Sequence, residues 1–552
     1  MSFHDTAWAI ATMVSRRSYE EMRLIIDEAV PYPHIDYIGY PVREYVLHIP
    51  LPERLVPHDL RGNNVIMWRI FKACIAHEAG HAYLTDPHIY DGWKKDKDKV
   101  VANFSANLIE DFRVENFLTS KWAGLGEDLA LANVIAYLRF RPLNEFDKGL
   151  KRIMIASLSY VFLKSVKGDL FKDEEETVRR ILDVLNGVKW TKRSEALISA
   201  AEEVYNELIK YGSSDMIRAS PVIPHHDGKA SSEFLKSTVL NLNEDIKAIL
   251  KEASLKLSLG DSADNLLNGD ALSEANYVFH NEALLRKKEK NILSIYQKNK
   301  YNFLGVCIPR SDYSMYLRVK RRIANVTRNM LSNLILVKSE YEEETHQRGG
   351  LIDLIEAVQA VASESSRADV FKRLQRSAMG SAWAILVDAS ESLLHSRETL
   401  REVSICLAEV ANGLMSHDSW GLYIFSDKFL VIKDFEETYN RRVQSRLGNL
   451  MIGGATYLPD ALKITSERMI SLPQNYKVIV VLTDGQPHGY EGIEDETKRA
   501  IKSIERSGIT LIAIGIKSLK PKKYFRNFCY VNGFKDLAKN FVRLYYSITQ
   551  WF

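Results

Sequence analysis

Cysteine is scarce in this sequence, and no cysteine pair has the spacing of a metal or redox motif. The 552 residues contain four cysteines with no C-x-x-C pair among them, namely Cys74, Cys307, Cys406 and Cys529. A disulfide-stabilised secreted scaffold and a zinc site built from cysteines are therefore both excluded. The scarcity of cysteine favours a reducing compartment.

Long apolar runs and an excess of one charge are also lacking. No run approaches the about 20 apolar residues that a membrane-spanning helix needs. Asp5, Arg16 and Arg17 near the N-terminus argue against a signal peptide. The formal net charge of +3 gives no support for a protein devoted to nucleic acid or to a membrane surface. We expect a cytoplasmic protein with no membrane partner and no specific nucleic-acid partner.

The apolar residues that are present suffice for several cores. Hydrophobic residues make up 46% of the chain and charged residues 26%, which is typical of globular proteins, and this length predicts more than one domain. We expect a mainly helical domain over 1–212, a helical middle region and linker over 213–379, and an α/β domain over 380–552. The linker contains the pair His225 and His226, which we expect to be exposed to solvent.

The most specific chemical signal is the H-E-x-x-H motif from His77 to His81, inside a helical pattern over 68–84. Residues four apart share one face of a helix, so His77 and His81 can bind one zinc ion from the same side. Glu78 would then lie beside the open coordination position, where a zinc-bound water needs a general base. The motif predicts a zinc site and, as a further hypothesis, a metallopeptidase whose catalytic base is Glu78.

The third zinc ligand must come from another segment. We expect Glu110, which follows after enough residues for a loop and a returning helix, and which would complete a His, His, Glu set with water in the fourth position. Its neighbour Asp111 would accept a hydrogen bond from a ligand histidine and orient it. Asp86, His88 and Glu115 are alternatives for the third ligand. Both a catalytic and a structural zinc are compatible with such a set.

One extended segment interrupts the helical N-terminal region. Residues 35–51 are rich in tyrosine and β-branched side chains, a composition typical of strands. Zinc peptidases commonly have a strand beside the active-site helix, and the substrate pairs with its edge. This segment is the candidate for that strand.

Strands and helices alternate from Ala382 onward. Continuous apolar runs, typical of buried parallel strands, are separated by amphipathic segments. Strands are expected at 382–387, 420–425, 477–482 and 509–516, and helices at 400–415, 458–470, 494–506 and 534–548. The alternation predicts a doubly wound, Rossmann-like parallel sheet with right-handed crossovers.

Oxygen-bearing side chains follow two of these expected strands. Asp388, Ser390 and Ser392 form a D-x-S-x-S motif after the first strand, Asp484 follows the strand at 477–482, and Thr456 lies in a Gly-Gly-Ala-Thr loop. The carboxyl ends of neighbouring parallel strands form the ligand crevice of such sheets. Hydroxyls and carboxylates suit Mg²⁺ or another small divalent cation. We therefore predict a cation site from these residues, with one position free for a partner's carboxylate.

This motif set resembles the von Willebrand factor A domain and its metal-ion-dependent adhesion site, over about 380–552. With 349–353 and the basic stretch 371–376, the chain is similar to the cobalt-chelatase T-subunit family and the nitric-oxide-reductase accessory D proteins. The H-E-x-x-H segment with 107–115 resembles the metallopeptidase-like segment of their relatives. One position departs from the pattern: Glu391 stands where relatives usually have glycine, in a D-x-S-G-S core, and adds a carboxylate beside the site.

The resemblance implies a hexameric AAA+ ATPase of the MoxR type as partner, which engages the A domain and remodels a client protein. The sequence has no G-x-x-x-x-G-K-[ST] motif, so ATP hydrolysis would belong to that partner. Two functions are compatible with these signals: a zinc metallopeptidase-like protein that acts with the ATPase, and a non-catalytic adaptor or scaffold. A subunit of a metal-chelatase-like complex is a weaker alternative, because the chelating subunit would be another chain.

Overall fold

The computed structural model describes residues 3–39, 42–214, 217, 221–223, 226, 233–235, 269–299, 301–338, 341–347, 349, 351–363, 367–376 and 380–549. The chain forms two compact units, 1–287 and 288–552. Their boundary lies within helix α11 (Gly269–Gln297), inside the predicted middle region. Within the described ranges, no helix combines the length and apolar character needed to cross a membrane.

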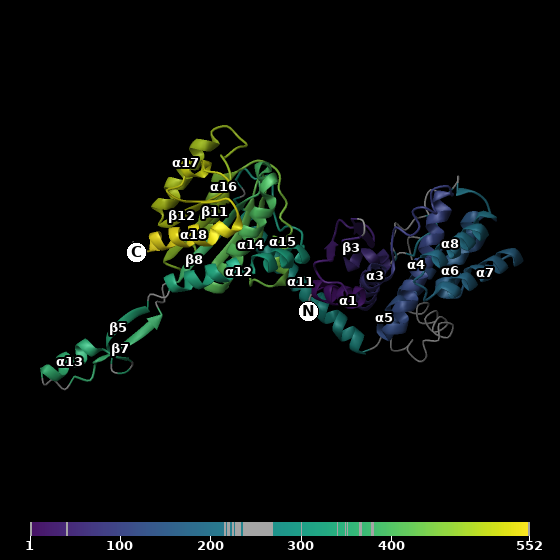
Figure 1. The fold of residues 1–552 in the computed structure, drawn as a ribbon, viewed down its shortest axis with the longest axis horizontal. Helices are drawn as coiled ribbons and strands as arrows, with labels where there is room; N and C mark the ends of the chain where they lie inside the picture. The colour runs from purple at the N-terminus through teal and green to yellow at the C-terminus, as the bar shows by residue number, and fades with distance from the viewer. Residues whose placement is uncertain are drawn as a thin grey trace. The chain divides into compact units, whose positions relative to one another are not determined.

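The first unit is mainly helical, as the sequence predicts, with one small sheet (Figure 1). Its helices are α1 (Phe3–Ser15), α2 (Pro52–Leu55), α3 (Asn64–Leu84), α4 (Lys99–Lys121), α5 (Ala123–Arg139), α6 (Leu150–Leu163), α7 (Lys172–Val188) and α8 (Ser194–Ile209). Its strands are β1 (Met22–Asp27), β2 (His34–Ile38) and β3 (Glu44–Pro50). In the sheet order β1-β3-β2, β1 runs parallel and β2 antiparallel to β3. The predicted extended segment at 35–51 is confirmed as the β2–β3 pair, and β1 is a further strand that the sequence analysis did not predict.

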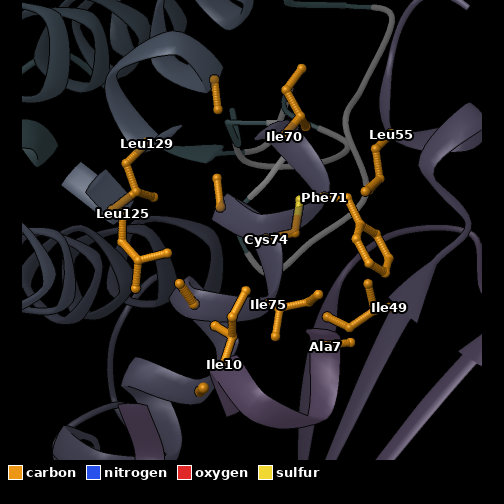
Figure 2. Close-up of a cluster of buried hydrophobic side chains, with 14 of the residues drawn as sticks. Ala7, Ile10, Ile49, Leu55, Ile70, Phe71, Cys74, Ile75, Leu125 and Leu129 are labelled. Carbon is orange, nitrogen blue, oxygen red and sulfur yellow. The ribbon is translucent and has the colours of Figure 1, made fainter. Parts of the chain in front are cut away.

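Helix α3 carries the H-E-x-x-H motif through the apolar interior of this unit. It begins after Asn63, whose side chain accepts a backbone N–H hydrogen bond from the first turn. Every residue over 65–82 except Lys72 is buried. Figure 2 shows apolar neighbours around this helix, which include Ile10 of α1, Ile49 of β3 and Leu129 of α5. Because close packing on all sides prevents the helix from shifting, the motif lies on a rigid element.

Helix α4 lies against α3 at the motif itself. It begins after Asp98, whose carboxylate accepts the backbone N–H groups of Val100 and Val101. A methyl group at Gly80 would lie 2.5 Å from Cγ1 of Val114 on α4, which is shorter than a carbon–carbon contact allows. The glycine of the motif therefore lets α4 approach, and this brings the α4 side chains toward the two histidines.

A second core of this unit lies between α4, α6, α7 and α8. Four described residues that follow α8 also belong to it, namely Ile217, Ile223, Phe234 and Leu235. The segment that the sequence analysis treated as a linker is therefore anchored at these positions by apolar burial.

The second unit is built on a seven-stranded sheet in the order β13-β12-β11-β8-β9-β10-β4. The strands are β4 (Val306–Cys307), β8 (Ser381–Asp388), β9 (Trp420–Phe425), β10 (Phe429–Lys433), β11 (Tyr476–Thr483), β12 (Ile509–Ile516) and β13 (Asn527–Val531). Neighbouring strands from β13 to β9 are parallel, whereas β10 is antiparallel to β9. The four predicted strands are confirmed to within one residue at each end, and β4, β10 and β13 are strands that the sequence analysis missed.

Helices cover both faces of this sheet (Figure 1). One face packs against α12 (Tyr313–Lys338), α14 (Arg397–Leu414), α15 (Arg441–Gly448) and α18 (Phe534–Thr549), and the other against α16 (Leu458–Ile470), α17 (Ile493–Arg506) and the end of α11. Successive residues of β8 alternate between the two cores, as a strand with two buried faces requires. The predicted doubly wound α/β arrangement and its four helices are confirmed.

Between α12 and β8 lies a second small sheet in the order β5-β7-β6. It consists of β5 (Tyr341–Gln347), β6 (Leu351–Ile352) and β7 (Phe371–Arg376), with helix α13 (Leu354–Ala362) between β6 and β7. This part of the region predicted to be helical is therefore antiparallel sheet instead. β5 pairs with β7 antiparallel, with Glu344 opposite Arg373.

Two candidate metal centres

The two histidines of the motif converge with an aspartate from α4. Nε2 of His77 and Nε2 of His81 lie 3.0 Å apart. Oδ1 of Asp111 lies 3.1 Å from Nε2 of His81 and 3.5 Å from Nε2 of His77. These separations fit three donors of one zinc ion, which binds nitrogen and carboxylate oxygen at about 2.0–2.2 Å. Glu78 is fully buried on the same helix.

Glu110, which the sequence predicts as the third ligand, is engaged elsewhere. Its carboxylate accepts hydrogen bonds from Arg113 at 2.6 Å, from the Thr85 hydroxyl at 2.9 Å and from the Tyr90 hydroxyl at 2.8 Å. The structure thus exchanges the two predicted places: Asp111 faces the histidines, and Glu110 reaches them only through Thr85. Consecutive residues of a helix point about 100° apart, so only one of the two carboxylates can face α3.

Thr85 orients the second histidine of the motif. Because its hydroxyl donates to Glu110, it accepts a hydrogen bond from Nδ1 of His81, 3.0 Å away. The proton of His81 is thereby held on Nδ1, and the lone pair is on Nε2, which faces Asp111. Metal-binding histidines typically have such a partner on the other ring nitrogen.

His226 is a member of this cluster that the sequence analysis missed. We expected it to be exposed, but it is fully buried, and its ring stacks on His77 with centroids 4.0 Å apart and planes 6° from parallel. Nδ1 of His226 lies 3.2 Å from Oδ2 of Asp111, and Nε2 lies 2.7 Å from Oε1 of Glu115. The only sequence signal for His226 as a site residue was the pair of histidines among prolines. No local sequence pattern predicts that this pair would lie beside α4. His225 lies outside the described residues.

The alternative ligands of the sequence analysis lie in other places. His88 has its Nδ1 3.0 Å from Oδ2 of Asp91 at the surface, and Asp86 accepts the backbone N–H of His88. Glu115 belongs to the cluster through the contact of its carboxylate with Nε2 of His226.

Electrostatic interactions in the cluster favour the protonation states that metal ligands need at His77 and Asp111, whereas they favour the charged form of His226. Burial, followed by the charge of His226, lowers the pKa of His77 to about 3. Burial alone would raise the pKa of Asp111, but the charge and hydrogen bonds of His226 hold it well below its usual range. Burial would lower the pKa of His226, yet Asp111 and Glu115 raise it to about 9. Near neutral pH His77 is neutral and Asp111 is ionised, as metal binding requires.

A second group of metal-binding side chains lies on the small sheet of the first unit. His34 on β2 and His48 on β3 are cross-strand partners with stacked rings, 4.3 Å between centroids. Nε2 of His48 lies 3.0 Å from Oδ2 of Asp36. The three could hold a metal ion, but they are only partly buried. Metal measurements on the buried cluster therefore need a variant that removes this group.

In the second unit, the D-x-S-x-S motif lies at the carboxyl end of β8. Asp388 is fully buried; it accepts hydrogen bonds from the backbone N–H of Ser390 at 2.9 Å and from the Thr483 hydroxyl at 2.5 Å. The hydroxyls of Ser390 and Ser392 lie 3.1 Å apart, and Ser392 donates to Asp484 at 2.9 Å. Burial raises the pKa of Asp388 to about 6 and also raises that of Asp484. Four of the five predicted residues, Asp388, Ser390, Ser392 and Asp484, are thus linked by hydrogen bonds, the first link through the Ser390 backbone N–H.

The loop that carries Thr456 lies beside this motif. The backbone N–H of Gly453 donates to the carbonyl of Ala389 at 2.8 Å, and that of Glu391 donates to the carbonyl of Gly454 at 3.1 Å. Gly454 has a φ of +85°, a conformation that glycine adopts without strain. Because β9 and β11 lie on opposite sides of β8, the site is at the point where the strand order reverses, the usual ligand position in such sheets.

Comparison with known proteins agrees with this part of the fold. Residues 384–543 match the family model of the von Willebrand factor type A domain. Protein NorD of Brucella abortus (strain 2308) is 26% identical over 151 residues, 24% of this chain and 24% of NorD. An uncharacterized protein of Pseudomonas aeruginosa is 31% identical over 111 residues, 18% of each chain. The chain therefore spans about a quarter or less of the length of these relatives.

Among solved structures, the von Willebrand factor type A protein from Catenulispora acidiphila is 17% identical with a TM-score of 0.25, over 30% of this chain and 42% of that one. The family match, the sheet order and the positions of Asp388, Ser390 and Ser392 concern the same unit. The C-terminal part of this chain carries a von Willebrand factor type A domain.

Proposed function

We propose that this protein is an accessory protein whose A domain binds a protein partner through a divalent cation. The observation that supports this function is the group of hydrogen-bonded residues at the reversal point of the sheet, from Asp388 through Ser390 and Ser392 to Asp484. Asp388 and Asp484 at the two ends of this group contribute carboxylates, and Ser390 and Ser392 between them contribute hydroxyls. This donor set is the chemistry that Mg²⁺ takes in proteins.

In the proposed site, Ser390, Ser392 and Thr456 would hold Mg²⁺ directly or through water, while Asp388 and Asp484 supply negative charge. Thr483 keeps the Asp388 carboxylate in place from the neighbouring strand. The remaining position would take a carboxylate of the partner, and this makes the contact dependent on the cation.

The partner that we propose is an AAA+ ATPase of the MoxR type, with a protein client that the first unit contacts. Support comes from the likeness to NorD proteins and from the absence of an ATP-binding motif in this sequence. A cytoplasmic site is part of the same proposal, and the four free thiols agree with it.

Binding of the full chain to a purified MoxR-type ATPase, with Mg²⁺ and with EDTA, tests this function. Asp388→Ala should abolish the binding that Mg²⁺ supports. Asp495→Ala, which removes an exposed carboxylate from α17, is the matched control and should bind as the unchanged chain does. Equal binding by the chain and by Asp388→Ala, or binding that EDTA leaves intact, would refute a cation-dependent contact.

A second candidate function is that of a zinc metallopeptidase, favoured by the convergence of His77, His81 and Asp111. The donor set fits zinc, and a bound zinc would supply a water whose pKa is lowered to about 7. Glu78 would accept the proton of that water, the role that the H-E-x-x-H motif predicts for it.

Peptide hydrolysis by the zinc-loaded chain, compared with Glu78→Gln, tests the second candidate. Zinc content should be the same in both, because Glu78 is not among the converging donors, while hydrolysis should be lost in the variant. Hydrolysis at the unchanged rate in zinc-containing Glu78→Gln would exclude this mechanism.

A further inference from the structure

We propose that His226 is a fourth protein ligand of the zinc site, so that the site is closed by the segment that follows α8. The inference rests on the zinc binding proposed for His77, His81 and Asp111. It goes beyond that proposal because it assigns a ligand from a distant part of the chain and predicts that no coordination position is left for water while His226 is bound.

The positions of the donor atoms support a single four-ligand site. Ligand atoms of His77, Asp111 and His226 all lie within 4.8 Å of one another. Nε2 of His81 lies 3.0 Å from Nε2 of His77 and 3.1 Å from Oδ1 of Asp111, so His81 and His226 share these two neighbours. Asp111 lies between the histidines, with Oδ1 toward the α3 pair and Oδ2 toward His226. Three imidazoles and one carboxylate make up a donor set that zinc accepts in tetrahedral geometry.

The hydrogen bonds of His226 are those of a metal-binding histidine. Its Nε2 lies 2.7 Å from the Glu115 carboxylate, and Glu115 is itself held by the amide of Asn133 at 3.0 Å. With the Nε2 proton held by Glu115, a zinc ion would bind Nδ1, the nitrogen that faces Asp111, by displacing the proton on Nδ1. Thr85 orients His81 through the other ring nitrogen in the same way. Carboxylate partners of this kind fix the ring and strengthen the ligand.

Ile223 and His226 are built into the core of the first unit. The backbone N–H of His226 donates to the carbonyl of Ile223 at 2.9 Å, and Ile223 is fully buried. The His226 ring meets the edge of Phe162 on α6, 5.1 Å between centroids. A buried imidazole is costly unless both nitrogens are used, and here both face partners. A zinc ion would then tie these residues to α3 and α4.

Closure has a chemical consequence. Structural zinc sites have four protein ligands, whereas catalytic sites have three and leave one position for water. With His226 bound, the site is therefore structural. Hydrolysis would require His226 to leave, which would free a coordination position for water. His226 would thus control the site.

Zinc affinity of the full chain tests the assignment, measured by competition with a chelator in a His48→Ala background that removes the partly exposed group on β2 and β3. His226→Ala should weaken zinc binding at least about 10-fold. His280→Ala removes an exposed histidine of α11 and is the matched control; its affinity should stay within about twofold of the background. Glu115→Gln retains the His226 imidazole and should give a smaller loss.

Cobalt substitution gives a second reading that does not depend on affinity. Acetohydroxamate, a ligand for open metal positions, should leave the visible spectrum of the Co²⁺-loaded chain unchanged and should alter that of His226→Ala. Circular dichroism at the measuring temperature confirms that each variant is folded. If His226→Ala does not fold, the test uses the folded variant Glu115→Gln. Weaker zinc binding by that variant then supports the role of His226 as a ligand.

The outcomes separate this inference from the zinc proposal beneath it. If the unchanged chain binds zinc, and His226→Ala binds it equally and shows no new acetohydroxamate response, His226 is only an ion-pair partner of Asp111 and Glu115 and the inference is overturned. If neither binds zinc after metal is added, both the inference and the zinc site itself are overturned.

Discussion

Gly80 on α3 faces Val114 on α4 so closely that a methyl group on Gly80 would lie 2.5 Å from Cγ1 of Val114. This approach of two helices places Asp111 beside His77 and His81. The glycine of the H-E-x-x-H motif therefore has a packing role that is separate from the chemistry of its neighbours.

Gly80→Ala should therefore destabilise the first unit by about 1–3 kcal/mol and weaken zinc binding, because α4 must move away. In an exposed helix the same change would stabilise by about 1 kcal/mol. The sign of the change in the free energy of unfolding therefore shows whether Gly80 has the packing role. Chemical denaturation and zinc competition measure both effects. Adding Val114→Ala should restore part of each loss, and a double variant as weak as Gly80→Ala would contradict the packing explanation.

Removal of the Asp111 carboxylate and removal of the Glu110 charge should have different effects on zinc binding. Asp111→Ala should abolish stoichiometric zinc, because it removes the only carboxylate that faces both motif histidines among the described residues. Glu110→Gln should retain one zinc per chain at about 10-fold weaker affinity, because it acts through Thr85. Elemental analysis and chelator competition distinguish the two variants.

Both variants are compared below their unfolding temperatures, because Glu110→Gln also takes an ion pair from the buried Arg113. Loss of zinc in Glu110→Gln together with retention in Asp111→Ala would restore the prediction made from the sequence.

Glu391 should have opposite effects on the cation and on the partner. Its exposed carboxylate stands beside the oxygen donors, so it attracts Mg²⁺ and repels an acidic partner. Glu391→Gln should weaken Mg²⁺ binding and strengthen ATPase binding at saturating Mg²⁺, each by about two- to fivefold, and both effects should shrink as salt is added. Calorimetric titration with Mg²⁺ and binding of the ATPase measure them. Effects of the same sign on both would rule out simple charge as the cause.

Lys433 should make stability depend on alkaline pH. Burial lowers its pKa to about 8, and its ammonium donates to the carbonyls of His417 and Trp420, both at 2.7 Å. An unfolded lysine titrates near about 10.4, so from pH 8 to about 10 the unfolded chain holds a proton that the folded chain has lost. The free energy of unfolding therefore rises with pH across this window.

Lys433→Met lacks this titration and is the control. The difference in the free energy of unfolding, the lysine chain minus the methionine chain, should grow by about 2 kcal/mol between pH 8 and 10. Urea denaturation at each pH measures it, and a constant difference would show that Lys433 titrates normally.

Local patterns were sufficient for the predicted elements with a regular apolar pattern. The strand at 420–425 and the helix at 458–470 agree with β9 and α16 at both ends, because continuous apolar runs and helical spacing are properties of short stretches. The same patterns missed β10 and the β5–β7 pair, which are short or rich in charge. Pairing with a neighbouring strand, rather than their own composition, makes these segments extended.

The sequence by itself determined the helix that presents His77 and His81, the D-x-S-x-S motif at the end of a buried strand, and the α/β character of the C-terminal unit, because each depends on residues close together in the chain. Only the tertiary structure decided that Asp111 rather than Glu110 faces the histidines, since this depends on how α4 is rotated against α3. It also brought His226 to Asp111 and Glu115, because that contact joins segments more than a hundred residues apart, and no local periodicity encodes which distant surfaces will pack together.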